Sequence, residues 1–397
     1  MRITPGSELT QRFKALQRLM IAQNLDAIIL LQNSDLFYFT GSIQRGIYYL
    51  PVAGEPVYLV IKDFDRACRE SQLDCIRKIS SIRQLNEHLS ELGLPVPERV
   101  GMELDVLPVQ QFKRYQKLLP DAEISDISHL LRTVRAVKSD YEIEIMDACA
   151  VLADKTYEYA KKLIRPGMSE LAVAAELECF ARKEGHQGVI RFRSFNAELY
   201  FGHIFSGDTG AVPAYLDAPL GGTGLNPAVG QGSGNKPIIA GEPIIIDFII
   251  ARDGYLVDQT RTLSFGPLSD RLQRAYADMV RVQDKLCEIA RPGVAWGDIY
   301  QQCCDLADRL GYKDNFMGFS GAQVSFIGHG IGIEVDEYPF IARGFDDDAL
   351  EKNMTFAFEP KAVFPSVGAV GIENTWKVTE TGITRMTYAD EELAILA

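Results

Sequence analysis

The acidic residues that could do chemistry in this chain lie inside apolar, strand-like segments. Asp247 lies in the apolar run 243–250, and Asp258 follows 11 residues later, beyond the hairpin signal Asp253-Gly254. Because the two strands meet at that turn, we expect the two carboxylates about equally far from it, on adjacent strands. A carboxylate in an apolar run is costly unless it is paired or bound to a metal. This hairpin alone also permits a structural role, with Asp247 satisfied by an arginine or by backbone amides.

A second hairpin carries another pair of acids. The apolar run 354–358 leads to Glu359, the chain turns around residues 365–368, and Glu373 follows on the return strand. Four carboxylates could not share a dry site without cations, because like charges there repel one another or take up protons. Two divalent ions would neutralise them, and oxygen-rich ligation favours Mn, Fe, Co or Zn over a metal that needs thiolates.

One histidine is a candidate fifth ligand. His329 lies in the run Gly-His-Gly-Ile-Gly, and its glycine neighbours leave it room to approach another group closely. A single histidine is more often a hydrogen-bonded core residue. However, His88 and His129 lie in the N-terminal half, away from the carboxylates, and His186 in a Gly-His-Gln-Gly turn is expected to be structural.

These five residues together resemble the dinuclear metal site of the creatinase/prolidase/methionine aminopeptidase superfamily. The aspartate spacing, the Gly-His-Gly-Ile-Gly run and the Met-x-Phe-x-x-Glu-Pro run all match its pattern. The resemblance covers nearly the whole chain, because residues 33–41 are similar to the start of the creatinase-type N-terminal domain and residues 131–142 to its junction with the catalytic domain. The architecture is closest to that of Xaa-Pro dipeptidase and aminopeptidase P-like proteins.

The resemblance implies a fold and a domain division. It implies an α/β creatinase-type N-terminal domain over residues 1–134. It further implies an α+β "pita-bread" catalytic domain over residues 135–397, built from a pseudo-duplicated helix–sheet unit. Relatives with this N-terminal domain are generally dimers, so a homodimer is expected.

The resemblance also implies roles for the ligands. Asp258 and Glu373 would bridge two divalent ions, and Asp247 would chelate one of them. His329 and Glu359 would complete the other ion. A water shared by two cations becomes acidic enough to act as the nucleophile, and Glu359 would be the general base that passes its proton to the leaving amine.

Other positions bear on the substrate. His203, in the run 202–208, matches the family histidine that contacts the substrate. Asp336 stands where prolidases usually carry a second active-site histidine, which makes it a candidate substrate-binding residue. Gly371 stands where the family commonly has arginine, and Ile249 replaces the more usual glycine after Asp247. No metal ligand is lost by these departures, but the groups around the substrate differ.

The elements that position these residues recur along the chain. Ser139 and Glu142 have capping-box spacing and open a helix expected to reach Leu163. An Arg-Pro-Gly turn then precedes a second helix, and the same order of helix, Arg-Pro-Gly turn and helix returns downstream. We interpret the C-terminal part as a duplicated helix–turn–helix–sheet unit. The later helices are expected at 169–185, at 269–290 and in the segment that ends at Gly311, and residues 221–234 are expected to form an irregular loop.

The first ~130 residues indicate an α/β domain without catalytic groups of its own. Residues 11–23 have helical periodicity, and residues 27–31 and 57–61 are strand-like. Over the whole chain, 47% hydrophobic and 24% charged residues in 397 are typical of a globular protein of two domains.

Composition and charge narrow the possible partners and compartment. The net charge of −13, without a basic stripe, argues against nucleic-acid or anionic-membrane partners. No apolar run approaches the ~20 residues of a membrane span. The first residues lack the apolar core of an export signal. Seven cysteines without a Cys-x-x-Cys spacing indicate reduced thiols, so a cytoplasmic protein is expected.

Three functions remain open at this point. The first is a metallopeptidase that cleaves Xaa-Pro bonds at the N-terminus of small peptides. The second keeps the metal site but acts on a small amide, amidine or sulfonium compound, for which Asp336 would suit a more cationic substrate. The third is a pseudoenzyme that uses the fold only for binding. Such a protein is expected to have lost metal ligands, whereas all five are present here. Mn, Co, Zn and Fe all accept this ligand set.

Overall fold

The chain forms two compact units. The computed structural model describes residues 2–196, 198, 200–319 and 321–397. The first unit comprises residues 1–135 with the short segment 193–196, and the second comprises residues 136–192 with the chain from 197 onward.

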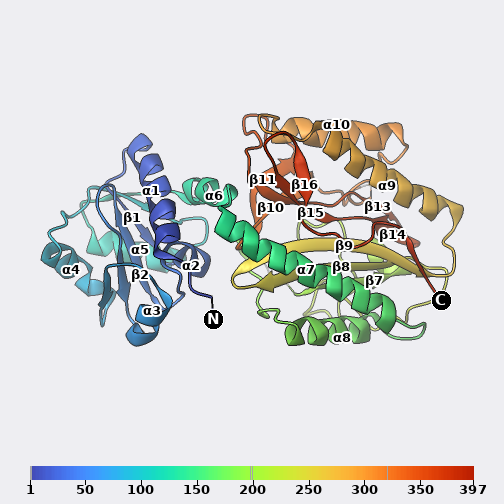
Figure 1. Ribbon diagram of the computed structural model, residues 1–397, viewed down its shortest axis with the longest axis horizontal. Coiled ribbons are helices and arrows are strands. Elements are labelled where there is room, and N and C mark those ends of the chain that lie inside the picture. The colour runs from blue at the N-terminus through green and yellow to red at the C-terminus, as the bar shows by residue number, and fades with distance from the viewer. Residues whose placement is uncertain (1, 197, 199, 320) are drawn as a thin grey trace. The chain divides into compact units, whose positions relative to one another are not determined.

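The first unit is built on a six-stranded mixed sheet (Figure 1) in the order β4-β3-β2-β1-β5-β6. The central strand β1 runs antiparallel to β2 and parallel to β5. The predicted strands 27–31 and 57–61 are confirmed as β1 and β3. The strands are β1 (Ala27–Leu30), β2 (Gly46–Pro51), β3 (Val57–Val60), β4 (Ile76–Lys78), β5 (Arg99–Met102) and β6 (Glu123–Asp126).

Helices flank this sheet and bury an aliphatic and aromatic core against it. The helix predicted over residues 11–23 is confirmed, and it begins earlier, at Gly6. The α/β character expected of this part is therefore confirmed. The helices are α1 (Gly6–Ala22), α2 (Asn33–Thr40), α3 (Phe64–Glu70), the short 3-10 turn η1 (Ile82–Gln84), α4 (Leu85–Glu91), α5 (Val109–Leu118) and α6 (Ser128–Ala136).

The second unit contains the same order of elements twice. Each time, two helices are followed by strands. The first set is α7 (Asp140–Leu163), α8 (Glu170–Lys183), β7 (Gly202–Ser206), the 3-10 turn η2 (Gly207–Ala211), β8 (Ile244–Arg252) and β9 (Tyr255–Phe265). The second set is α9 (Asp270–Ile289), α10 (Trp296–Arg309), β10 (Phe326–Ile331), β11 (Val335–Ala342), β12 (Thr355–Phe358), β13 (Lys361–Phe364), β14 (Gly368–Gly371), β15 (Asn374–Val378), β16 (Ile383–Arg385) and β17 (Ala394–Leu396).

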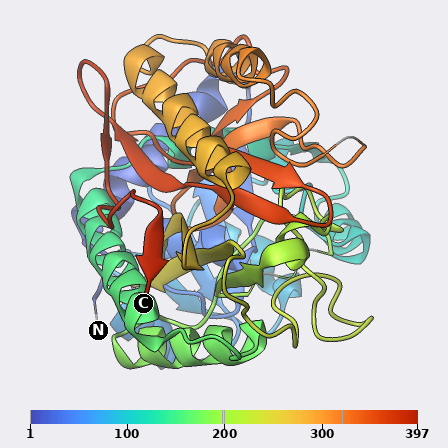
Figure 2. The same cartoon turned by 90° about the vertical axis from the view of Figure 1, so that its right-hand side faces the viewer.

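Both helix pairs enclose the strands. The strands form sheets in the orders β17-β9-β8-β7, β11-β10-β12-β15-β16 and β13-β14. Figures 1 and 2 show these strands between the pair α7–α8 and the pair α9–α10. Apolar residues of α9 and α10 form one core with residues of β10, β12 and β15.

The helix signals read from the sequence are confirmed. Ser139 caps α7 and forms the reciprocal capping box with Glu142, and Ser169 caps α8. In the two Arg-Pro-Gly turns, Gly167 and Gly293 both have a φ of +86°, a conformation that favours glycine. The same backbone geometry at both turns supports the interpretation of this unit as a duplication.

Two further expectations concern the whole chain. All seven cysteines have free thiols in the structure. Among the described helices, none combines the length and the apolar character that a membrane crossing requires. The segment 221–234 contains no helix or strand, as expected.

Candidate metal centre

The first hairpin places Asp247 and Asp258 on one face of adjacent strands. The turn at Asp253 and Gly254 has φ angles of +48° and +93°, which suits the tight turn predicted from this dipeptide. Asp258 pairs with Ile249, two residues from Asp247. Since side chains two residues apart on a strand point the same way, the two carboxylates are diagonal neighbours on one face.

The second hairpin places Glu359 and Glu373 opposite one another. They lie between the pair Phe358–Asn374 and the pair Lys361–Gly371, at the junction of β12 and β15 with β13 and β14. The backbone N–H of Glu373 donates to the carbonyl of Thr260, 3.1 Å away. The second hairpin is therefore tied to the strand that carries Asp258.

His329 lies on β10 between two glycines that neighbouring strands require. A Cβ at Gly328 would lie 2.5 Å from the carbonyl oxygen of Ala357, and one at Gly330 would lie 2.3 Å from that of Tyr338. The room left by these glycines is therefore filled by the strands on either side. His329 Nδ1 lies 3.2 Å from the carbonyl oxygen of Gly330. Its Nε2 lies 3.9 Å from Oε1 of Glu359.

Three of the five predicted ligands converge closely enough to hold one metal ion. Ligand atoms of Asp258, His329 and Glu373 all lie within 4.8 Å of one another, and all three residues are buried. The hydroxyl of Thr260 donates to Glu373 Oε2 at 2.6 Å and fixes that carboxylate. One imidazole nitrogen with carboxylate oxygens suits Mn, Fe, Co or Zn, so the donor chemistry fits a divalent metal.

A lysine that the sequence analysis missed lies among the carboxylates. Lys361 Nζ is 2.5 Å from Oε2 of Glu359, 3.1 Å from Oδ2 of Asp247 and 3.3 Å from Oε2 of Glu373. Its side chain is only 1% exposed. Its signal in the sequence was a lone lysine in an apolar strand, two residues after Glu359.

The electrostatics of the cluster follow from burial and from this lysine. Burial raises the pKa of Glu359 to about 7, although Lys361 opposes the rise. Burial and the neighbouring Glu373 raise the pKa of Asp258 well above its usual value. Burial acts to lower the pKa of Lys361, but the carboxylates of Asp247 and Glu359 outweigh it, so its pKa is raised. The cluster therefore favours positive charge at its centre.

His203 lies beside the cluster, on the neighbouring strand. It pairs with Asp247 between β7 and β8, and its ring stacks on Phe205 with centroids 5.4 Å apart. The side-chain nitrogen of Gln231 is 3.3 Å from His203 Nε2. Burial lowers the pKa of His203, with Asp247 opposing the effect. The structure thus brings His203 next to one of the predicted ligands.

Asp336 lies behind His329. Its Oδ1 is 3.5 Å from His329 Nδ1, the ring nitrogen that also faces the carbonyl of Gly330. Burial lowers the pKa of His329, but Asp336 and Glu359 outweigh it, and the pKa is raised. Its contact with the His329 ring was not foreseen from the sequence.

Arg261 supports the cluster from behind and was also missed. Its guanidinium donates to the carbonyl oxygens of Glu373 at 2.7 Å and of Ala389 at 2.8 Å, and to Asn374 Oδ1 at 2.8 Å. The side chain is almost fully buried. Its position three residues after Asp258, in the run Asp-Gln-Thr-Arg-Thr, was the available signal.

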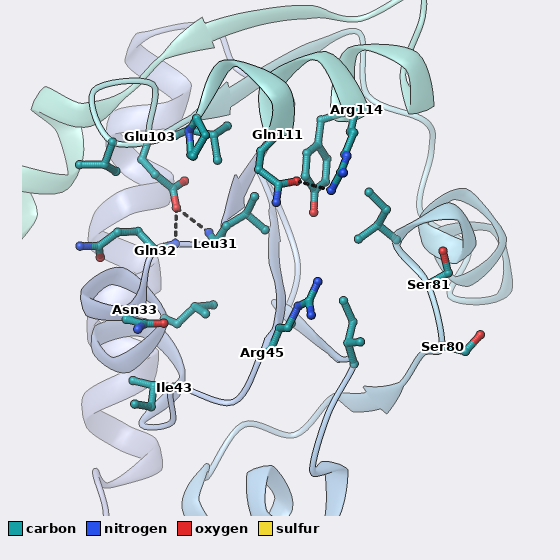
Figure 3. Close-up of a pocket in the computed structure, with 18 residues that line it drawn as sticks. Leu31, Gln32, Asn33, Ile43, Arg45, Ser80, Ser81, Glu103, Gln111 and Arg114 are labelled. Atoms are coloured by element: carbon teal, nitrogen blue, oxygen red, sulfur yellow. Dashed lines mark hydrogen bonds between the residues drawn. The ribbon is translucent and has the colours of Figure 1, made fainter. Parts of the chain in front are cut away.

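A separate pocket of about 510 Å³ lies in the first unit (Figure 3). Its lining includes Arg45, Glu103 and Arg114. Glu103 accepts the backbone N–H groups of Leu31 and Gln32, at 2.5 and 2.7 Å. None of the predicted site residues lines this pocket.

Comparisons with known proteins agree with both units. Residues 144–380 match the model of metallopeptidase family M24, and residues 12–137 match that of the creatinase/prolidase N-terminal domain. An Xaa-Pro dipeptidase of Pyrococcus furiosus is 25% identical over 389 residues, covering 97% of this chain and all of the relative. An uncharacterized peptidase of Bacillus subtilis is 26% identical over 392 residues, covering 97% of this chain and 100% of the relative.

A solved structure extends the agreement to the fold. The Xaa-Pro dipeptidase from Bacillus anthracis superposes with a TM-score of 0.83 at 25% identity, covering 98% of this chain and 100% of the other. The predicted architecture, a creatinase-type domain followed by a pita-bread catalytic domain, is therefore confirmed. Divalent metal ions as cofactors are confirmed for the family, and the ligand cluster agrees with them. With a family match across 144–380, the chain belongs to metallopeptidase family M24.

Proposed function

We propose that this chain is a metal-dependent peptidase that cleaves Xaa-Pro bonds at the N-terminus of small peptides. The observation that carries the proposal is the buried cluster of Asp258, His329 and Glu373, with Asp247 and Glu359 beside it. Relatives named Xaa-Pro dipeptidase match the chain over nearly its full length and support the choice of substrate.

The five ligands divide between two metal positions. Position 1 comprises Asp247, Asp258 and Glu373, and position 2 comprises Asp258, His329, Glu359 and Glu373. The close approach of Asp258, His329 and Glu373 supports position 2. The diagonal placement of Asp247 and Asp258 on one face supports position 1.

A divalent ion bound there supplies a Lewis acid that polarises the scissile carbonyl and acidifies water. The chain's own residues position the groups and move the proton. Glu359 takes up a proton from the attacking water and passes it to the nitrogen of the leaving proline. Lys361 holds Oε2 of Glu359 in place through its 2.5 Å contact.

Two side chains next to the ligands complete the proposed site. His203 lies on β7 and pairs with Asp247 of β8. It donates a hydrogen bond to the carbonyl oxygen of the peptide substrate. Asp336 keeps the His329 ring oriented, because its carboxylate lies 3.5 Å from Nδ1, and it is also the proposed contact for a polar group of the substrate.

The proposal extends to assembly and compartment. We propose that the protein is a homodimer, as expected from the creatinase-type N-terminal domain. We also propose that it acts in the cytoplasm, which the seven free cysteines support. Size-exclusion chromatography with light scattering tests the first point, and a mass near that of one chain would contradict it.

The deciding experiment is hydrolysis of a peptide panel by metal-stripped protein re-supplied with Mn, Co or Zn. The panel pairs each Xaa-Pro dipeptide and Xaa-Pro-Yaa tripeptide with an Xaa-Ala analogue of equal length. We expect metal-dependent cleavage of the proline peptides, with little cleavage of the alanine analogues. The preferred length separates a dipeptidase from an aminopeptidase.

A different result would redirect the substrate assignment. If the metal-loaded protein cleaved none of the peptides, the peptidase proposal would be overturned. That result would favour a small amide, amidine or sulfonium substrate, for which Asp336 is the specific observation, because it places a further carboxylate beside His329 that would suit a cationic group.

A further inference from the structure

The side chain of Lys361 lies where a metal position would be. Its Nζ is 3.1 Å from Asp247 Oδ2 and 3.3 Å from Glu373 Oε2, which are two of the three residues of position 1. The third contact, at 2.5 Å, is to Oε2 of Glu359, a residue of position 2 whose other oxygen, Oε1, faces His329. An ammonium group therefore occupies the oxygens that would hold the ion at position 1.

The lysine is built into the site. It lies on β13, where it pairs with Gly371 on β14, and its carbonyl accepts the N–H of Met317 at 2.9 Å. Since the side chain is 1% exposed, its charge is compensated by the surrounding carboxylates and not by water.

Gly371 is matched to this lysine. A Cβ at Gly371 would lie 2.6 Å from the carbonyl oxygen of Pro360, 2.7 Å from Cγ of Lys361 and 2.9 Å from its Cα. Any side chain at residue 371 would therefore have to move the backbone at Pro360 and the stem of Lys361. Gly371 is also the departure from the family pattern noted in the sequence, and it pairs directly with Lys361.

The remaining ligands still make a metal site. Asp258, His329 and Glu373 keep their ligand atoms within 4.8 Å of one another, and Glu359 Oε1 faces His329. Four carboxylates need cationic partners, and one divalent ion together with the Lys361 ammonium supplies three positive charges. A second divalent ion would have to approach within a few ångströms of that ammonium and compete for its oxygens.

We propose that the ammonium of Lys361 replaces the ion at position 1, so that each chain binds a single divalent ion at position 2. This inference rests on the ligand set of the proposed function and specifies its cofactor stoichiometry. The ammonium of Lys361 then holds the carboxylates of Asp247 and Glu373 together in place of that ion.

The test is the metal content of the full chain, measured without reference to turnover. Wild-type protein, Lys361→Ala and Lys377→Ala are stripped of metal, incubated with excess Mn²⁺ and gel filtered, and metal is determined by mass spectrometry. Lys377 is a partly buried lysine on β15 and serves as the matched control. We expect one ion per chain for wild type and for Lys377→Ala, and two for Lys361→Ala.

Electron paramagnetic resonance of the same samples gives a second readout. Wild type should show the six-line spectrum of an isolated Mn²⁺, and Lys361→Ala the broadened spectrum of two coupled ions. Two coupled ions in wild type would overturn the inference and leave the proposed function intact. No bound ion in wild type would overturn both. If Lys361→Ala does not fold, the wild-type stoichiometry and spectrum still decide.

Discussion

The two oxygens of Glu359 face different partners. Oε2 contacts the ammonium of Lys361 at 2.5 Å, whereas Oε1 points toward Nε2 of His329, 3.9 Å away. One oxygen is thus held by a fixed charge, and the other faces the space that a metal and water would share. This division suits a residue that must bind an ion and also carry a proton.

We predict that Glu359→Gln loses most of its turnover while it keeps bound metal. The amide preserves the shape and one ligand oxygen but cannot accept the proton, so kcat should fall by roughly 100-fold or more. Steady-state kinetics on a cleaved Xaa-Pro peptide, with metal analysis of the same sample, checks this. Glu334→Gln, a change at a buried glutamate outside the ligand set, is the control. Turnover within a few-fold of wild type would exclude Glu359 as the base.

Residue types indicated candidate ligands but not the residues that support them. Five ligands could be named because carboxylates in apolar strands stand out, and because paired hairpins place them symmetrically. Lys361 was missed because its meaning depends on three carboxylates from distant segments. Arg261 was missed for the same reason, since its acceptors lie up to 129 residues away. The contacts of such supporting residues emerge only when the strands are assembled.

At the scale of elements, hairpin register determines which acids meet. Asp258 pairs with Ile249, so a slip of one residue in this hairpin would turn Asp247 to the opposite face. The Asp253-Gly254 turn fixes that register, and this turn could be predicted from the sequence. The hydrogen bond from the N–H of Glu373 to the carbonyl of Thr260 connects the two hairpins. It could not be predicted from the sequence, because it joins segments that belong to different sheets.

The turn after α8 gives the second unit a dependence on pH. His186 Nδ1 accepts the N–H of Gly188 at 2.9 Å, and Nε2 lies 3.1 Å from the carbonyl oxygen of Ile249. The neutral ring with its proton on Nε2 satisfies both contacts, whereas a protonated Nδ1 would oppose the N–H of Gly188. Burial lowers the pKa of His186 to about 4.

We therefore predict that stability falls as the pH drops below the unfolded pKa of about 6.5. Below pH 6.5 His186 is protonated in the unfolded chain, but in the folded chain it stays neutral down to about pH 4. This difference should lower the free energy of unfolding by on the order of 2 kcal/mol between pH 7 and pH 5. Urea unfolding at both pH values checks it, with His186→Gln as the comparison: that variant also loses the stacking on Phe201, so the two proteins are compared by the change in stability between the two pH values and not by stability itself. Equal pH slopes for the two proteins would contradict the assignment.

At the scale of the molecule, the cluster joins the two halves of the duplicated unit. Asp247 and Asp258 come from strands after the first helix pair. His329 comes from a strand after the second pair, and Glu359 and Glu373 from the junctions between later strands. The recurring Arg-Pro-Gly turns and helix pairs predicted this duplication from the sequence. The order of strands in the sheets did not follow from it, because strand pairing depends on contacts between distant segments.

Metal binding should therefore stabilise the folded chain as a whole. An ion that binds only the folded state adds about 2.7 kcal/mol at 100 times its Kd. We predict that chelation lowers the thermal unfolding midpoint by several degrees and that re-supplied metal restores it. Asp258→Ala should fold, bind markedly less metal and show little shift, whereas Asp305→Ala, an exposed change on α10, should behave as wild type. An unchanged metal content in Asp258→Ala would contradict the assignment of Asp258 as a ligand.

The guanidinium of Arg261 connects the end of the chain to this centre. It donates both to the carbonyl of Glu373 and to the carbonyls of Ala389 and Asp390, which lie just before the final strand β17. That strand pairs in parallel with β9, the strand that carries Asp258. The last residues are thus a brace for the ligands. Removing the chain from Ala389 onward would take two acceptors from Arg261 and loosen the candidate metal site, although every candidate ligand would remain.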